Sequence, residues 1–165
     1  MTPIDKEHLM TAIETHRDEL IEATCRRLQK LPGSHYEMID YERHLEREET
    51  FLDALLQGLR EEPPEAFLTF VAQLSAQRAE EGYSLPEFQE AFNVVEDALW
   101  DMLLTHFAPD AALVGMLSLV NALFRTAKDH LAQVFLQEAL AAKRELEEVR
   151  KKFRAYRKVT KRGHL

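Results

Sequence analysis

Residues 109–156 read PDAALVGMLSLVNALFRTAKDHLAQVFLQEALAAKRELEEVRKKFRAY, and no proline follows Pro109. This pattern predicts one helix that takes up nearly a third of the chain. Its first half, residues 111–124, is apolar on almost every side, so we expect it to be buried over most of its surface. In its second half the apolar residues follow at alternating steps of three and four, typical of the seam of a two-stranded coiled coil. The seam comprises Ala132, Phe135, Ala139, Ala142, Leu146, Val149, Phe153 and Tyr156.

The change of pattern within one uninterrupted helix predicts a rod that starts inside a core and ends as a dimer interface. We expect two parts, a helical sensor domain over residues 1–138 and a coiled-coil signalling helix with a basic tail over residues 139–165. The residues assigned to dimer contacts and signalling are Phe135, Leu146, Val149, Phe153 and Tyr156. The pattern therefore favours a homodimeric signal-input module, whose rod responds to events in the domain.

Helix-start and helix-stop signals divide the residues before this rod into four more helices. Thr2, Pro3 and Asp5 form a helix start, and the first helix is expected to run without a break to Leu31, before Pro32 and Gly33. A second helix is expected over residues 38–60. Its charged residues are expected to form a solvated, partly self-paired face. They are Glu42, Arg43, Glu46, Arg47, Glu48 and Glu49.

A third helix is expected between Pro64 and Gly82. The fourth opens with the sharpest local signal in the chain, the capping box of Ser84 and Glu87, and ends near residue 107. Only five glycines and six prolines leave little material for sheet turns. We therefore predict an all-α fold, a globin-like irregular bundle of about five helices whose last helix extends into a coiled coil.

Charge is distributed unevenly along the chain. Residues 1–142 carry 11 Lys and Arg against 26 Asp and Glu, whereas residues 143–165 carry 10 against 3. A single cysteine, Cys25, fits a reducing compartment, and the amino terminus lacks the apolar core of a secretory leader. The longest apolar run has 14 residues, fewer than the roughly 20 that span a bilayer. We expect a cytoplasmic protein with no membrane partner.

Metal and haem sites were sought through the spacing of the seven histidines. No histidine has Glu three residues before it, and the chain has neither HExxH nor paired cysteines, so we predict no metal site and no resident cofactor. Haem needs only one axial histidine, which leaves a haem-binding globin-type gas sensor as an alternative, with His106 or His130 as the ligand. We favour ordinary hydrogen-bonded histidines over haem ligation at both positions.

An enzyme is the function class that the residues support least. Cys25 is followed by two arginines, which would lower a thiol pKa, but no partner pattern for a nucleophile accompanies it. There is no glycine-rich phosphate loop, and the acidic body would repel nucleotides. We therefore predict a non-catalytic protein.

Four residues are candidates for binding a small ligand that the sequence does not identify. Arg78, Arg125 and Lys128 interrupt apolar helix faces, so each needs a carboxylate partner or a ligand. Trp100 completes the set. The basic segment of residues 150–162 raises a second alternative, a dimer that binds nucleic acid through this helix, but its aromatic residues lie on the seam and favour dimer packing.

The segment of residues 78–100, RAEEGYSLPEFQEAFNVVEDALW, resembles the signature of the RsbRD N-terminal domain family, found at the front of RsbR stressosome proteins and some bacterial histidine kinases. The match is carried by Arg78, Gly82, Ser84, Leu85, Glu87, Phe92, Leu99 and Trp100. The predicted order of helices over about residues 5–140 is compatible with this family. The resemblance implies a globin-like fold without haem, a homodimer, and a regulatory role in stress response. The final helix would then lead into an output domain or a signalling partner protein.

Overall fold

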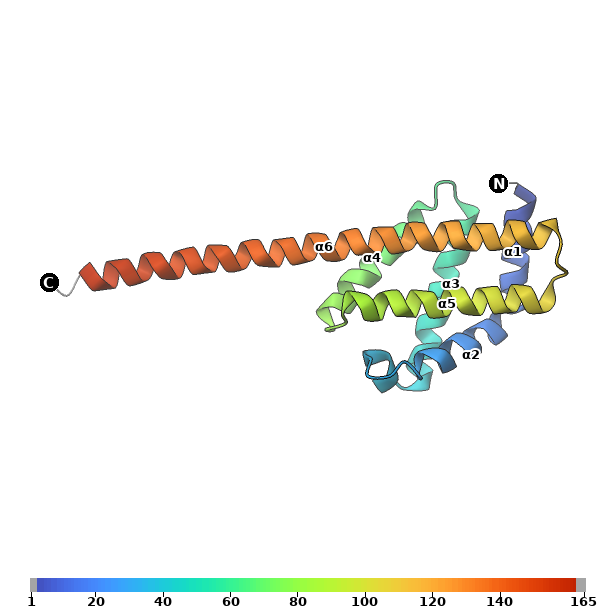
Figure 1. The fold of residues 1–165 in the computed structure, drawn as a ribbon, viewed down its shortest axis with the longest axis horizontal. Helices are drawn as coiled ribbons and strands as arrows, with labels where there is room; N and C mark the ends of the chain where they lie inside the picture. The colour runs from blue at the N-terminus through green and yellow to red at the C-terminus, as the bar shows by residue number, and fades with distance from the viewer. Residues whose placement is uncertain (1–2, 163–165) are drawn as a thin grey trace.

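The computed structural model describes residues 3–162, with side chains over residues 5–154. Over this range the chain consists of helices without strands, which confirms the predicted all-α bundle (Figure 1). The elements in chain order are α1 (Pro3–Thr15), α2 (Arg17–Leu28), the 3-10 helix η1 (His35–Met38), α3 (Tyr41–Arg60), α4 (Glu65–Glu80), α5 (Leu85–His106) and α6 (Ala111–Arg162). The globin-like arrangement within this class stays a prediction.

The first predicted helix is in fact two helices, which corrects the expected unbroken run to Leu31. His16 separates α1 from α2 with φ −107° and ψ 22°, outside the helical region. The bend lets α1 pack on α6 while α2 packs on α5 (Figure 1). Arg17 fixes α2 to α3, with its Nη2 atom 2.8 Å from Asp53 Oδ1 and 3.1 Å from the Glu49 carbonyl oxygen. No glycine or proline marks the bend, so tertiary packing decides it.

The second predicted helix begins three residues later than expected. Residues 35–38 form η1, and α3 starts after Asp40, whose Oδ1 accepts a hydrogen bond of 2.9 Å from the Arg43 N–H. An aspartate at this position satisfies a backbone donor that the first turn leaves free. The helical pattern of the sequence extends back to residue 38, but the Asp40 cap fixes the start of α3 at Tyr41.

The predicted capping box at the start of α5 is confirmed, and it does more than start a helix. The Ser84 hydroxyl accepts from the Glu87 N–H at 3.4 Å, and the Glu87 carboxylate accepts from the Ser84 N–H at 2.8 Å. Glu87 also accepts from the His35 N–H at 2.9 Å, so one carboxylate ties η1 to α5. These bonds, those from the Ser84 backbone most of all, lower the pKa of Glu87 to about 2.

Helix α6 is continuous from Ala111 to Arg162, so there is no break in the rod. It begins at Ala111 rather than at Pro109 because Asp110 caps it: Oδ1 accepts from the Ala112 and Leu113 N–H groups at 3.0 and 3.1 Å. Its first half packs on α1, α4 and α5, but one face is open to solvent and Val114 is 63% exposed, so the predicted burial over most of its surface is only partly confirmed. Phe124 is fully buried there.

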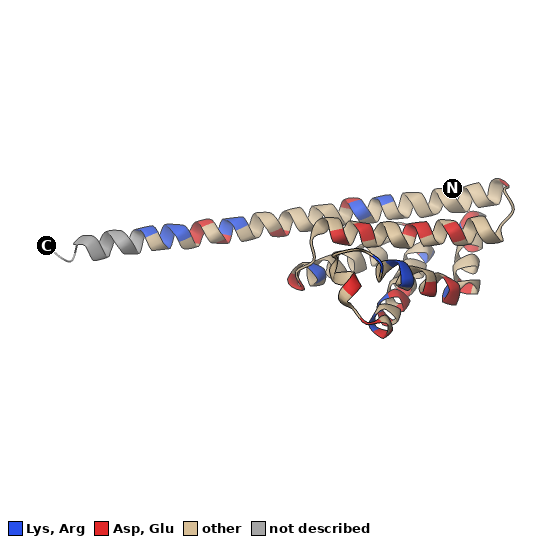
Figure 2. Cartoon of the chain, turned by 60° about the horizontal axis from the view of Figure 1, so that its bottom comes forward, with Lys and Arg blue, Asp and Glu red and all other residues tan. Residues whose placement is uncertain are grey.

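Beyond the bundle α6 projects as a single rod (Figure 1). Every side chain over residues 139–154 is exposed, including Leu146, Val149 and Phe153. Acidic and basic residues alternate along this rod before basic ones take over (Figure 2). The Tyr156 side chain, assigned to the dimer seam, lies outside the described residues. The division at residue 138 stays a prediction.

By length and composition alone, residues 111–154 of α6 contain a stretch apolar enough to cross a membrane. This is weak evidence, because core helices of proteins in solution pass the same test. In this chain 39% of the apolar window is buried against the rest of the domain.

Candidate functional site

A small cavity lined by both apolar and polar side chains lies in the helical core, where α2, η1, α3, α4 and α5 meet. Its volume is about 40 Å³. A buried water needs about 10–15 Å³ by this measure, so the space suits a few waters or a very small polar molecule. The polar lining residues are Tyr36, His44, Arg47, Glu48 and Arg78.

Glu48, on α3, is the acidic group of the cavity. Its side chain is buried, with 8% of the residue exposed, whereas the sequence placed it on a solvated face; that prediction was wrong. Burial raises the pKa of Glu48 to about 8, against the opposing attraction of Arg78 and Arg47. The carboxyl group therefore changes charge close to neutral pH, at a buried position.

Arg78, on α4, is the more buried of the two arginines that line the cavity and is 4% exposed. Its Nη1 donates to Glu81 Oε2 at 2.9 Å, and its guanidinium carbon lies 5.5 Å from the centroid of the Tyr83 ring. The Nε–H is buried and has no hydrogen-bond partner among the described residues. A buried donor without a partner lowers stability by about 1–3 kcal/mol, so a ligand that accepts a hydrogen bond from this atom removes that cost.

His44, one turn before Glu48, is fully buried. Its Nε2 lies 2.9 Å from the Tyr36 carbonyl oxygen, which can only accept, so Nε2 carries the hydrogen. Burial lowers the pKa of His44, which keeps the ring neutral and leaves Nδ1 as an acceptor. Nδ1 is also buried without a partner in the described part of the chain.

The cavity thus combines four chemical properties within one small space. It has a permanent positive charge, a carboxyl group that titrates near neutrality, one free donor and one free acceptor. Such a site can take up a proton, ordered waters, or a small polar or anionic molecule. It has no activated nucleophile: burial raises the pKa of nearby Cys25 to about 12, which leaves that thiol protonated.

Of the four predicted ligand residues, the structure places only Arg78 in this cavity. Lys128 on α6 lies 2.5 Å from Glu96 Oε2 on α5, so its charge is already paired. Trp100 is exposed on the outer side of α5. Arg125 lines a separate surface depression on α6 together with Asp129 and His130. The four residues therefore do not form one site.

The two histidines proposed for haem both lie at the surface. His106 ends α5 and contacts Glu19, with Nε2 to Oε2 at 2.9 Å. His130 lines the same depression as Arg125. A haem pocket must enclose a large apolar group. The depression at His130 has a volume of about 530 Å³, but it is open to solvent and is lined mostly by polar and charged side chains. The arrangement gives no support to haem ligation by either residue.

Apart from Arg78, the polar residues that build the cavity were missed, although one of them has a signal in the sequence. Residues 41, 45, 48, 52, 55 and 59 follow one another at alternating steps of four and three, so Glu48 occupies an inward position of α3. The prediction that Glu48 is exposed to solvent was based only on its charge. The roles of His44 and Tyr36 had no comparable signal, because they depend on where η1 packs.

One further cluster comes together that the histidine spacing did not reveal. His16, Glu19 and His106 place one donor atom each within 4.8 Å of one another. The spacing expected of a metal site has Glu three residues before a histidine, whereas here Glu19 follows His16 by three and His106 comes from α5. The prediction of no metal rests on spacing alone and stays untested.

The profile of the family described as RsbT co-antagonist protein rsbRD N-terminal domain matches residues 18–150. The chain belongs to this family. The resemblance carried by residues 78–100 is thereby confirmed, and the family is one of stressosome-type regulatory sensor domains rather than a known catalytic family. Searches of curated proteins and of solved structures returned no match to this chain.

The residues that carry the resemblance to this family also have roles in the structure. Ser84 and Glu87 build the cap that ties η1 to α5, and Arg78 supplies a cation of the cavity. Phe92 lines the same cavity. The stretch that resembles this sensor family therefore includes residues that build the cavity, not only residues that stabilise helices.

Proposed function

We propose that the protein is a non-catalytic signal-input domain that acts as a cytoplasmic homodimer. A change of protonation or occupancy in the buried cavity alters the position of α6, and the rod carries that change to its far end. The single observation that supports this most is a path of aromatic contacts from the cavity to the point where α6 leaves the bundle.

The path starts at two phenylalanines of α5 that line the cavity, Phe88 and Phe92. The Phe92 ring centroid lies 6.1 Å from that of Phe124 in the buried half of α6. The Phe88 ring centroid lies 6.4 Å from that of Phe135. Close-packed rings of this kind cannot shift independently, so a change in the cavity is transmitted to α6 by contact.

Phe135 stands at the boundary between the two parts of α6. It was assigned to the dimer seam, but it is half-buried against its own domain, and we now assign it to the internal path. The next apolar residues are exposed: Leu136 is 61% exposed and Leu140 45%. The apolar side chains that follow Phe135 therefore need a partner from outside the chain.

A second copy of the chain is the partner that the seam best fits. The exposed seam residues Leu146, Val149 and Phe153 keep the alternating three and four spacing of a two-stranded coiled coil. Isolated solvent-exposed rods of this composition are stabilised chiefly by association. The basic end of the paired rods is then available to an output domain or a signalling partner protein of acidic character.

The signal that we propose is the charge state of Glu48 or a small polar molecule that pairs with it. A neutral Glu48 is compatible with burial, whereas the ionised form is drawn towards Arg78 or needs water. The two forms favour different packing of α3 against α4 and α5. An effector changes the population of two states only by its different affinity for them.

Sedimentation equilibrium on the intact chain tests the dimer. We expect a dimer for the wild type and for Gln137→Glu, which adds the same charge on the outer face of the rod. Leu146→Glu introduces that charge into the seam and should weaken dimerisation by about 100-fold, through lost apolar burial and repulsion between copies. A monomeric wild type at high concentration, or equal effects of the two variants, contradicts the proposal.

Native mass spectrometry of protein purified from cells tests the cavity. Retention of a small polar molecule by the wild type, and its loss in Arg78→Met, supports ligand sensing. If the wild type is purified with no bound molecule, protonation of Glu48 is the remaining signal, and it is then the one to measure. A molecule that Arg78→Met retains unchanged is bound elsewhere and contradicts the assignment of this cavity as the ligand site.

A further inference from the structure

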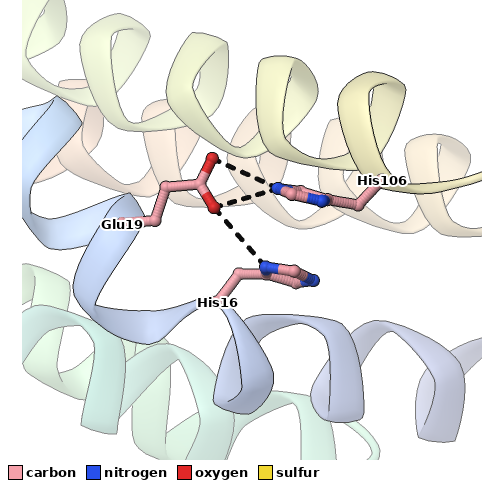
Figure 3. A group of neighbouring side chains, drawn as sticks. All are labelled: His16, Glu19 and His106. Atoms are coloured by element: carbon pink, nitrogen blue, oxygen red, sulfur yellow. Dashed lines mark hydrogen bonds and ion pairs between the residues drawn. The ribbon is translucent and has the colours of Figure 1, made fainter.

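The end of α5 meets the bend between α1 and α2 in a cluster of three side chains, His16, Glu19 and His106 (Figure 3). His106 Nε2 lies 2.9 Å from Glu19 Oε2 and 3.2 Å from Oε1. His16 Nδ1 lies 3.5 Å from Glu19 Oε2. The two imidazole rings stack with centroids 3.8 Å apart. All three polar ends thus face one point at the surface.

From this geometry we propose that His16, Glu19 and His106 form a binding site for a divalent transition metal ion, with Zn²⁺ as the best fit. Two imidazoles and one carboxylate are a donor set that zinc takes, with the fourth position left to water. Zinc bonds of about 2.0–2.2 Å put neighbouring donors of a tetrahedron roughly 3.3–3.5 Å apart. Each imidazole nitrogen already lies 2.9 to 3.5 Å from a Glu19 oxygen, and the three donor atoms lie within 4.8 Å of one another.

The position of the three residues makes entry of a metal ion easy. Half of the Glu19 side chain and about a third of the His106 side chain are exposed, so water and ions reach the cluster. The Glu19 carboxylate must turn aside and the two rings must splay from their stack to admit the ion. All three are side-chain movements at the surface. Glu14, Arg17 and Asp18 line the depression that holds His16 and Glu19. Glu14 pairs with Arg60 and Arg17 pairs with Asp53, which leaves Asp18 as the additional charge that attracts a cation.

The consequence of occupancy follows from which elements supply the ligands. His16 forms the bend between α1 and α2, Glu19 lies in the first turn of α2, and His106 is the last residue of α5. A bound ion would fasten the bend to the end of α5, immediately before the connection to α6. This is a metal-dependent clamp at the opposite end of α5 from the capping box, and it is independent of the polar cavity.

Isothermal titration with ZnCl₂ tests the site on the whole chain, prepared without a histidine tag. We expect one ion per chain, and a rise in Tm of about 5 °C at saturation because the ion binds only the folded state. His16→Ala, Glu19→Gln and His106→Ala should each weaken binding by about 100-fold or more, since each removes a direct ligand. His130→Ala, a histidine on a different surface, should leave the affinity unchanged.

Cobalt provides a second readout, because Co²⁺ in a tetrahedral site of nitrogen and oxygen donors gives intense visible absorption. The bands should be absent in His16→Ala/His106→Ala. Circular dichroism checks that this double variant is folded. Zn²⁺ binding that persists in the folded double variant, or no binding by the wild type at about 100 μM free Zn²⁺, overturns the proposal.

Discussion

The helical domain and the projecting rod of α6 break the usual pattern of burial in opposite directions. In the domain, polar groups are buried: Glu48, Arg78 and His44 lie inside an otherwise apolar core. On the rod, apolar groups are exposed: Leu146, Val149 and Phe153 face solvent. Departures of this kind mark functional positions rather than errors of folding. The first set offers a place for a signal, and the second offers a surface for a partner.

The largest contrast between the two regions concerns apolar contacts. Leu52→Ala in the domain, where Leu52 is 1% exposed, should lower the free energy of unfolding by about 2–5 kcal/mol. Leu146→Ala on the rod should change it by less than about 0.5 kcal/mol when measured at concentrations where the chain is monomeric. Urea unfolding followed by circular dichroism measures both. Similar losses for both variants would mean that the rod packs within its own chain.

The next largest effect concerns the buried carboxyl group of Glu48. Its pKa is about 8 in the folded protein and 4.5 when exposed, so the folded state binds the proton more tightly. The contribution of Glu48 to stability is therefore greatest below pH 4.5. It is lost as the pH rises towards 8, by up to about 1.4 kcal/mol per pH unit.

Glu48→Gln removes this titration, so the variant should gain stability relative to the wild type between pH 5 and 8. Urea unfolding at several pH values measures the difference. Glu49→Gln is the matched control, because Glu49 is the exposed neighbour on the same helix. A constant difference between Glu48→Gln and the wild type at all pH values would show that Glu48 does not titrate in this range.

A smaller effect tests the aromatic path between the regions. A double-mutant cycle of Phe88→Leu and Phe135→Leu should give a coupling energy of about 0.5–1.5 kcal/mol, the range for contacting aromatic pairs. Phe88→Leu with Phe67→Leu serves as a comparison. Additive effects of the two substitutions would show that Phe88 and Phe135 are not coupled, which contradicts transmission through this contact.

The smallest expected effect concerns the ion pair between Lys128 and Glu96, which also joins α6 to α5. Both side chains are partly exposed, so a cycle of Lys128→Met and Glu96→Gln should give a coupling energy of about 0.2–1 kcal/mol. Salt should reduce it. A coupling energy above about 2 kcal/mol, insensitive to salt, would give this pair a larger share in joining the two regions than the aromatic path has.

The sequence predicts best where the physical cause is local. The capping box of Ser84 and Glu87 and the continuity of α6 follow from residues a few positions apart, and both are confirmed. The bend at His16 has no local breaker, since it arises because α1 and α2 pack on different helices. The bend also brings Glu19 next to His106, 87 positions away in sequence, in the cluster proposed to bind a metal ion.

For a similar reason, only part of the cavity could be predicted from the sequence. Arg78 was singled out as a cation that needs a partner, and the structure gives it Glu81 and the cavity. Glu48 was assigned to solvent because a charged residue is rarely buried, although its place in the helical repeat pointed inward. For a charged residue that falls within an apolar stripe of a helix, its position in the helical repeat predicts burial better than its charge does.

The central claim is that the charge of Glu48 controls how two rods associate. The most direct test is the dimer dissociation constant, measured by sedimentation equilibrium from pH 5 to 9 for the wild type, Glu48→Gln and Glu49→Gln. We predict that the constant changes at least about fivefold across this range for the wild type and Glu49→Gln, and stays flat for Glu48→Gln. Identical curves for all three proteins, or a wild type that never dimerises, would contradict the account.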